Sequence, residues 1–299
     1  MIKRIVEIST EPFHLSVRWN QLQLRRHETD AEPVATIPCE DLGVVVVDHP
    51  ATTYSHQALL ALVDAGAAVV LCGPKHLPTG MLLPQAAHTN VVWRLQHQIE
   101  AGRPLRKRLW KQIVRVKIRN QAAELPADHP TRQRLLDMAL QVRSGDPENH
   151  EAQAAKLYWE VWGGGTFRRD PDGTDVVNGM LNYGYAIVRS AWARALVAAG
   201  FNPALGLFHR NRSNPFCLAD DLMEPMRPWV DTIVARLTAD NRNDVDRTAK
   251  QALLGLLHRE VRTGDQTGPL LVALHRSCAS LDRCLQGKEK RLQLPAQVK

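Results

Sequence analysis

The sequence has few of the features that mark a secreted or membrane-bound protein. Among its 299 residues, no apolar run approaches the roughly 18 residues that a membrane-spanning helix needs. The first ten residues, MIKRIVEIST, hold an apolar stretch shorter than the roughly 7–15 residues of a signal-peptide core. The five cysteines are scattered and include no C-x-x-C pair, which argues against a disulfide framework and a zinc ribbon. We therefore expect a cytoplasmic protein with reduced thiols and no membrane partner.

Two catalytic motifs begin in this sequence but are not completed. The glycine run Gly163–Gly165 is not followed by the Lys-Ser/Thr pair of a phosphate-binding loop, so nucleotide hydrolysis is unsupported. His150-Glu151 begins like a zinc-protease motif, but Ala154 stands where the second histidine would have to be. The sequence thus disfavours both of these reaction classes.

Basic residues are concentrated in one segment of the chain. Overall, 38 Lys and Arg against 31 Asp and Glu give a net charge of +7, which is compatible with a nucleic-acid partner. Positions 103–119 hold no acidic residue, and the basic ones are Arg103, Arg106, Lys107, Arg108, Lys111, Arg115, Lys117 and Arg119. Apolar residues recur among them at helical spacing, at Leu105, Leu109, Ile113 and Val116.

This pattern predicts an amphipathic helix with its basic residues on the remaining faces. Those faces either lie along duplex phosphates or only meet solvent. In the first case, the DNA contacts would be Arg106, Lys107, Arg108 and Lys111.

Strand patterns and helix patterns occupy different parts of the chain. Alternating or β-branched runs predict strands over 2–8, 13–17, 22–24, 44–47 and 67–72, with a tight turn near Trp19–Asn20. A short helix is expected over 55–65, with Ser55 as its N-cap and Gly66 at its end. The segregation predicts an α+β fold, in which a small β-rich domain at 1–75 is available for dimer or partner contacts. A linker rich in glycine and proline would follow at 76–90, then an α-helical, metal-dependent catalytic domain at 91–299 with a frayed polar end.

Two segments carry residues suited to chemistry. Glu151 falls near a predicted helix start, where it would either serve a site or simply favour the helix dipole. Farther on, His209 lies in a loop. The acids Asp220, Asp221 and Glu224 follow it and lie within about one turn of helix of one another. Acids this close need solvent, arginine or a cation to relieve their repulsion, although a solvated helix start would also accommodate them. Carboxylates with one histidine suit Mg²⁺ or Mn²⁺ better than zinc.

Three motifs together resemble a known family. They are E-x-x-A-A-x-x-Y-W from Glu151 to Trp159, N-x-x-L-N-Y-G-Y from Asn178 to Tyr185, and a loop that begins at His209 and ends in F-x-L-A-D-D-L-M-E-P-M-R-P from Phe216 to Pro228. With L-P-T-G-M-L at 77–82, they resemble the CRISPR-associated integrase, the metal-dependent DNA endonuclease of spacer adaptation. The M-E-P-M-R-P form is most similar to the variants of type II systems.

The resemblance implies a set of site residues. The family's metal-binding glutamate corresponds to Glu151, its histidine to His209, and its third ligand, often aspartate, to Glu224. Asp221 corresponds to an upstream family acid. Together with Asp220 it would position the ligands without binding the metal ion itself. Which of the three acids completes the site stays open at this point. His209 is expected to act as a ligand, with general acid or base as the alternative, and Arg210 and Arg212 beside it would add DNA contacts. Asn182, Tyr183 and Tyr185 are expected mainly to pack.

The implied reaction is the insertion of short DNA fragments into a CRISPR array by attack of a 3′-hydroxyl on a phosphodiester. The implied partners are double-stranded DNA, a second copy of the chain, and a small ferredoxin-like adaptation protein. Two alternatives remain from the residues themselves. One is a metal-dependent nuclease of other DNA repair or processing biology, and the other is a non-catalytic DNA-binding scaffold.

Overall fold

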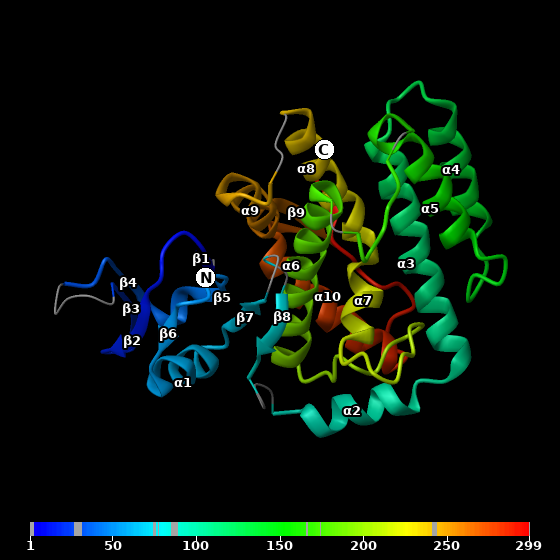
Figure 1. The fold of residues 1–299 in the computed structure, drawn as a ribbon. Helices are drawn as coiled ribbons and strands as arrows, with labels where there is room; N and C mark the ends of the chain where they lie inside the picture. Colours follow the sequence, from blue (N-terminus) through cyan, green and yellow to red (C-terminus); the bar gives the residue numbers. More distant parts are fainter. Residues whose placement is uncertain are drawn as a thin grey trace.

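The computed structural model describes residues 3–26, 32–73, 76, 78–84, 89–165, 167–173, 175–240 and 244–298. Two four-stranded sheets lie on one side of the molecule and a body of helices on the other (Figure 1). No helix within the described ranges is long and apolar enough to span a membrane.

The two sheets come from the first 84 residues. One has the strand order β1-β5-β7-β8, and the other has the order β4-β3-β2-β6. The strands are β1 (Arg4–Ile8), β2 (His14–Arg18), β3 (Gln21–Arg25), β4 (Ala35–Pro38), β5 (Leu42–Val47), β6 (Thr53–Tyr54), β7 (Ala68–Cys72) and β8 (Pro78–Leu82). Strand β5 pairs in parallel with β1 and with β7, whereas β7 and β8 are antiparallel.

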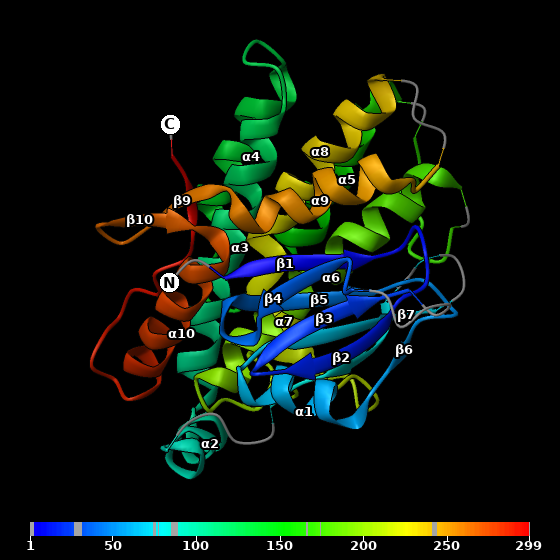
Figure 2. The same ribbon diagram turned by 90° about the vertical axis from the view of Figure 1, so that its left-hand side faces the viewer.

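The valine run of β5 is buried because both faces of its sheet are covered. Val44 and Val46 belong to the large core that this sheet shares with the helices. Val45 and Val47 belong to a second core, which the other sheet and helix α1 (His56–Asp64) close. In Figure 2 the two sheets and α1 lie in front of the helical body. Because successive side chains of a strand point to opposite faces of the sheet, this one run of valines contributes to both cores.

Several local predictions in this region are confirmed. Trp19 and Asn20 have φ values of 53° and 57°, as a tight hairpin turn between β2 and β3 requires. The Ser55 hydroxyl accepts the backbone N–H of Ala58 at 3.2 Å and so caps α1. Gly66 follows α1 at φ 75°.

The linker prediction is wrong at Pro78–Leu82. This stretch forms the edge strand β8, whose Gly80 lies opposite Leu71 of β7. Proline is tolerated there because the first residue of an edge strand need not donate to the sheet. Residues 74, 75, 77 and 85–88 of the expected linker lie outside the described residues.

The rest of the chain is mainly helical, as predicted. Its helices are α2 (Val91–Glu100), α3 (Arg103–Glu124), α4 (Pro130–Gln141), α5 (His150–Val161), α6 (Val176–Ala198), α7 (Cys217–Met223), α8 (Arg227–Ala239), α9 (Arg247–Gly255) and α10 (Leu270–Leu285). Helix α6 is buried along most of its length, and α7, α8, α9 and α10 pack against it.

The helical region is nevertheless not all-α. A three-stranded antiparallel sheet forms from β9 (Glu260–Thr263), β10 (Gln266–Pro269) and β11 (Ala296–Gln297). The expected frayed end is therefore wrong for β11 and the residues before it. Leu292 and Leu294 are buried, and the Gln112 side chain of α3 accepts the N–H of Leu292 at 2.9 Å. These two leucines pack into the large core and so hold the otherwise polar segment in place.

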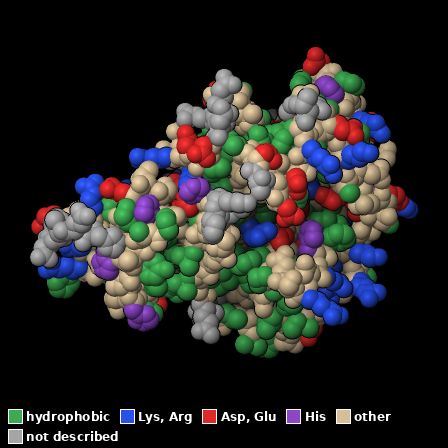
Figure 3. Space-filling view, in the orientation of Figure 1, with side chains coloured by type: hydrophobic (Ala, Val, Ile, Leu, Met, Phe, Trp, Pro, Cys, Tyr) green, Lys and Arg blue, Asp and Glu red, His purple; other side chains and the backbone are tan. Residues whose placement is uncertain are grey.

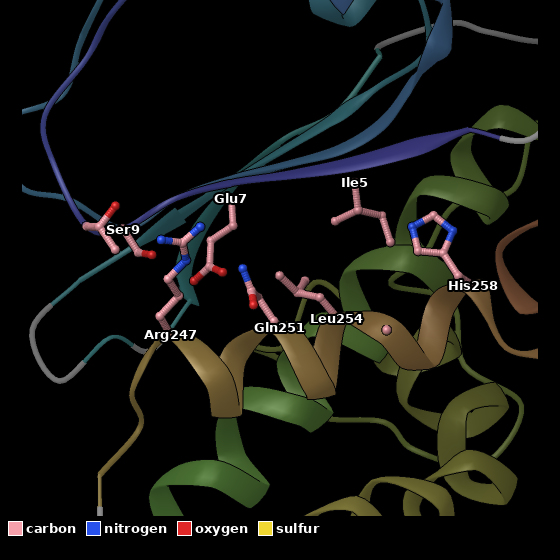
Figure 4. A pocket seen from close by; sticks show the side chains of 9 residues that line it. Ile5, Glu7, Ser9, Arg247, Gln251, Leu254 and His258 are labelled. Carbon is pink, nitrogen blue, oxygen red and sulfur yellow. The ribbon is translucent and has the colours of Figure 1, made fainter. Parts of the chain in front are cut away.

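A buried ion pair and a cavity mark the junction between the first sheet and helix α9. Lys250 of α9 donates to Asp48, which follows β5, and both side chains are almost fully buried. Beside this pair, a cavity of about 270 Å³ opens between β1 and α9 (Figure 4). In Figure 4, Ile5 and Glu7 point from β1 toward α9, and Gln251 points back from the helix. None of the predicted site residues lines this cavity.

Candidate active site

Glu151 is held at the first turn of α5 by a neighbouring acid. The buried Asp146 carboxylate accepts the backbone N–H groups of His150 and Glu151, each at 2.9 Å. Because Asp146 already satisfies these helix N–H groups, the Glu151 carboxylate is free to point elsewhere. It accepts a hydrogen bond from the amine of Lys117 on α3. Glu151 therefore does more than favour the helix dipole.

Lys117 is the residue on which the candidate ligands converge. Its amine also donates to Glu224 Oε2 at 2.5 Å, so it lies between the two glutamates. Burial lowers the pKa of Lys117, but the charges of Glu224 and Glu151 outweigh this and hold that pKa above its usual value. The expectation that Lys117 lies on a polar face is wrong. It follows Leu109 and Ile113 at four-residue intervals on the buried stripe of α3.

Glu224 is buried and ionised. Arg227 Nε donates to its Oε1 at 2.8 Å, while Lys117 holds the other oxygen. Burial alone raises the pKa of Glu224, but the charges of Arg227 and Lys117 outweigh it and lower this pKa to about 2. The carboxylate is therefore negative at any physiological pH, as a metal ligand has to be.

His209 is oriented by Asp221. One Asp221 oxygen accepts the N–H groups of Leu207 and Phe208, at 2.6 and 3.0 Å. The other lies 2.6 Å from His209 Nδ1, which fixes a proton on that nitrogen and leaves Nε2 available. The hydrogen bond to Asp221 raises the pKa of His209 against the opposing effect of burial. A side chain at Gly206 would meet the His209 carbonyl oxygen at 2.4 Å, so this loop needs a glycine there.

Asp220 and Asp221 are both engaged away from the two glutamates. Asp220 accepts from Arg189 Nε at 2.8 Å and from Asn214 Nδ2 at 2.6 Å. Both Asp221 oxygens hold the His209 loop. Of the three neighbouring acids, Glu224 is thus the one that shares a partner with Glu151.

The donor set suits a hard cation, although its three side chains do not meet at one point in this structure. The ligand atoms of Glu151, His209 and Glu224 do not all lie within 4.8 Å of one another, and the Lys117 amine takes the place between the glutamates. Two carboxylates and an imidazole nitrogen match the preferences of Mg²⁺ and Mn²⁺.

Another cluster, not anticipated from the sequence, does meet that distance. In the part of the chain that the structure describes, the ligand atoms of Asp146, Glu148 and His150 all lie within 4.8 Å of one another. Its acids already have partners, because Asp146 caps α5 and Glu148 pairs with Arg143.

A cavity of about 210 Å³ opens beside Glu224 and is lined by Lys117, Glu224, Arg227, Tyr185 and Asp231 among others. The hydroxyl of Tyr185 donates to Asp231, and burial raises the pKa of this carboxyl to about 7. The expectation that Tyr185 mainly packs is thus incomplete: the ring is buried, but its hydroxyl belongs to a polar network.

Helix α3 carries the expected basic surface. Lys and Arg side chains gather over the lower half of α3 in Figure 3. Arg106, Lys107 and Arg210 line a common cavity, joined by Arg103. The other proposed DNA contacts, Arg108, Lys111 and Arg212, do not line it.

Residues 6–263 match the family model described as CRISPR associated protein Cas1. The chain belongs to the Cas1 family. It is 39% identical over 265 residues to the CRISPR-associated endonuclease Cas1 of Neisseria meningitidis serogroup C, covering 87% of this chain and 86% of that protein. A Cas1 endonuclease of Pyrobaculum aerophilum is 28% identical over 83% of this chain and 89% of its own length. The resemblance drawn from the three motifs is confirmed, and with it the expectation of an endonuclease.

Solved structures confirm the α+β fold. A Cas1 protein from Thermotoga maritima superposes with a TM-score of 0.74 at 13% identity, covering 99% of this chain and all of that one. A casposase bound to its integration product gives a TM-score of 0.79 at 18% identity, covering 98% and 92% of the two chains. A chain of a Cas6-RT-Cas1–Cas2 complex gives 0.78 at 16% identity, with 99% of this chain matching 36% of that one.

Proposed function

We propose that this Cas1-family chain inserts short DNA fragments into a CRISPR array at an active site built from Glu151, His209 and Glu224. The observation that carries this assignment is the convergence of the two glutamates on one buried amine, close to an imidazole held in a single orientation. Buried carboxylates brought this close repel each other unless a cation stands between them. In the structure that cation is Lys117.

The same groups are suited to holding a divalent metal ion. Glu151, Glu224 and His209 Nε2 would bind Mg²⁺ or Mn²⁺, which supplies positive charge that polarises a phosphoryl oxygen. Asp221 keeps the His209 proton on Nδ1, so that Nε2 would offer the ion a lone pair. Arg227 holds Glu224 ionised and in place.

The reaction exchanges one phosphodiester for another. The oxygen of a DNA 3′-hydroxyl gives up its proton and forms a new bond to phosphorus. The bond from phosphorus to the old 3′-oxygen breaks, and that oxygen takes up a proton and leaves as a hydroxyl, so that no proton is gained or lost overall. The attacking oxygen comes from DNA, so the site need not activate water. Its task is to position two DNA strands and stabilise charge on the phosphoryl group.

The partners follow from the family and the surface. We propose that the chain binds spacer and repeat DNA as a homodimer, together with a small ferredoxin-like adaptation protein. The basic surface of α3 and the solved Cas1–Cas2 and DNA-bound structures with the same fold support the binding of DNA and of another Cas protein. We place the protein in the cytoplasm, where its five free cysteines would stay reduced.

A strand-transfer assay tests the proposal. A labelled duplex is incubated with a repeat-containing target and Mn²⁺, Mg²⁺ or a chelator, and joined products are separated from cut ends. We expect joined products with either metal and none with the chelator. Cut ends alone would indicate a nuclease of other biology, and binding without any product would indicate a scaffold.

A matched pair of variants locates the metal. Glu151→Gln should abolish joining, whereas Glu148→Gln, three residues earlier in the Asp146–Glu148–His150 cluster, should leave most of it. The opposite result would move the catalytic metal to that cluster. Thermal melting and DNA binding of both variants should stay close to wild type.

A further inference from the structure

A cleft lies between helix α3, the β9–β10 hairpin and the end of the chain. It has a volume of about 720 Å³, and we call it the arginine cleft. In Figure 2 the hairpin and the red C-terminal segment lie beside α3. None of the candidate metal ligands lines this cleft. The side chains that line it include Gln112, Arg115, Arg119, Arg262, Asp265 and Arg291.

The arginine cleft and the candidate active site use different faces of α3. Arg115 and Arg119 each lie two positions from Lys117 in the sequence, which corresponds to about 200° around an α-helix. The Lys117 amine is buried against Glu151 and Glu224, whereas Arg119 is exposed and lines the cleft. A ligand of the cleft is therefore not a ligand of the candidate metal site.

The charge of the arginine cleft is unbalanced. Four arginines line it, against the single acid Asp265 among its described lining residues. Within the described ranges none of the four forms an ion pair, whereas Arg189 and Arg227 near the metal site each do. Arg115 donates to the Leu140 carbonyl oxygen at 2.7 Å, but its buried Nε has no hydrogen-bond partner among the described residues. Unpaired guanidinium groups around one concave site favour a polyanion.

The C-terminal wall of the cleft is fixed by side-chain hydrogen bonds to its backbone. Gln112 of α3 donates to the Lys290 carbonyl oxygen at 3.0 Å and accepts the Leu292 N–H at 2.9 Å. These two bonds hold the backbone on both sides of Arg291. The N–H of Gln293 donates to Ser280 of α10 at 3.0 Å and holds the next residues in place.

The opposite wall is fixed by the β9–β10 hairpin. Arg262 lies opposite Thr267 of β10 and Ala296 of β11, so its strand is paired on both sides. The turn of the hairpin contains Gly264 at φ 61°, where a Cβ would meet the Gln293 side chain at 2.6 Å. A glycine there lets the hairpin lie close to the C-terminal segment. The arginines therefore stand on a backbone that is already in place before a ligand arrives, which favours binding.

Linked phosphates match the cleft in charge and in geometry. The guanidinium fork of arginine binds two phosphate oxygens at once. A single phosphate carries a charge of about −1.5 to −2 near pH 7, which leaves part of the charge of four arginines unmatched. The described lining residues include no aromatic ring on which a nucleobase could stack. The lining leucines Leu292 and Leu294 are buried in the core, so they offer little surface to the apolar side chains of a peptide.

We propose that the arginine cleft binds a compact polyphosphate, a ligand with three or more linked phosphate groups, either free or as the 5′-triphosphate of a nucleotide. The phosphates lie between Arg115 and Arg119 of α3, Arg262 of β9 and Arg291 of the C-terminal segment. This site is separate from the metal ligands and from the basic residues at the beginning of α3. It does not depend on the proposed function.

Titration calorimetry of the whole chain tests the proposal. The buffer is free of metal ions, because polyphosphates bind them, and the probes are inorganic tripolyphosphate, ATP and orthophosphate. We expect one tripolyphosphate site per chain and much weaker binding of orthophosphate. Arg119→Gln and Arg262→Gln should each weaken tripolyphosphate binding by roughly 10-fold to 100-fold, as expected for a lost hydrogen bond to a charged group. Equal affinities for ATP and tripolyphosphate would support recognition of the phosphates alone, and tighter binding of ATP would support the nucleotide form.

A matched control variant and two competitors decide against the alternatives. Arg134→Gln removes an exposed arginine of α4 outside the cleft and should leave tripolyphosphate binding unchanged. All three variants should melt like wild type, because Arg119, Arg134 and Arg262 are exposed. Absence of binding to wild type, or an equal loss in Arg134→Gln, would overturn the proposal. So would displacement of tripolyphosphate by a blunt DNA duplex or by a hexaglutamate peptide with the same sensitivity to Arg262→Gln. The cleft would then be a surface for a nucleic-acid backbone or for an acidic protein segment.

Discussion

Two lysine amines are buried in the part of the chain that the structure describes, and their surroundings differ. Lys250 is 4% exposed and pairs with Asp48, where α9 meets the first sheet. Lys117 is 7% exposed and pairs with two glutamates from different elements, beside a cavity of about 210 Å³. The first amine is ion-paired with one carboxylate and the second with two, and a cavity opens beside each.

The difference lies in the number of carboxylates that share the buried amine. At the junction, removing Lys250 leaves the buried Asp48 carboxylate with His76, whose Nδ1 lies 2.9 Å from the same oxygen. At the site, Glu151 and Glu224 share the Lys117 amine, and under the proposed function they would bind a metal ion in its place. Buried ion pairs are weak evidence for either stability or function until their surroundings are known.

The largest expected effect is on strand transfer, and it distinguishes Glu224 from Asp220. Glu224→Gln should reduce strand transfer by about 100-fold or more, because a lost ligand removes stabilisation of the transition state. Asp220→Asn should reduce it less, since Asp220 meets Arg189 and Asn214 instead. Single-turnover rates at saturating Mn²⁺ provide the measurement. If Asp220→Asn proved the more damaging, Asp220 would become the third ligand.

The next effect is on stability at the junction. Lys250→Met should lower the free energy of unfolding by up to about 3–5 kcal/mol, because the buried Asp48 carboxylate would keep only the half-exposed His76 ring as its ion-pair partner. Adding Asp48→Asn should restore much of the loss. Urea unfolding of the single and double variants measures both. A loss below about 1 kcal/mol in the single variant would show that His76 or water compensates for the Asp48 charge at this junction.

A third expectation concerns the pH dependence near the Lys117 cavity. Burial raises the pKa of Asp231 from its ordinary 3.8 to about 7, so the folded protein holds a proton there that the unfolded chain releases. The stability contribution is therefore fully present below about pH 4 and is lost as pH rises through about 7. The change should be on the order of 2–4 kcal/mol. Asp231→Asn should flatten this part of a profile of unfolding free energy against pH; an unchanged profile would assign the dependence to other groups.

The smallest expected effect tests whether Lys117 competes with the metal. Lys117→Met should tighten Mn²⁺ binding by about 10-fold, because the ion would no longer have to displace a positive charge. Titration calorimetry without DNA gives this affinity, and Lys111→Met on the same helix serves as the control. Weaker Mn²⁺ binding in Lys117→Met, with Lys111→Met unchanged, would mean that Lys117 keeps the carboxylates in position instead of competing.

Much of the fold and part of the site could be predicted from local patterns. The valines of β5, the hairpin turn at Trp19–Asn20 and the cap at Ser55 depend on neighbours in sequence, and all three are confirmed. The strand at Pro78–Leu82 and the docked end at Leu292 depend on partners elsewhere in the fold, and neither follows from its own residues. Lys117 could have been singled out from the sequence. It continues the apolar stripe of Leu109 and Ile113, where a charged residue is unexpected unless it has a buried partner.

The sequence by itself determined that a strand-rich part precedes a mainly helical part, the family, and which residue types could serve as ligands. Three short motifs are enough for that, because they are local and their side chains are chemically distinctive. Only the tertiary structure decided how the acids divide their work. Asp220 goes to Arg189, Asp221 to His209, and Glu224 to the amine that it shares with Glu151. The physical reason is that a charged side chain takes its role from the partners packed against it, and the fold brings these partners from other helices and loops of the chain.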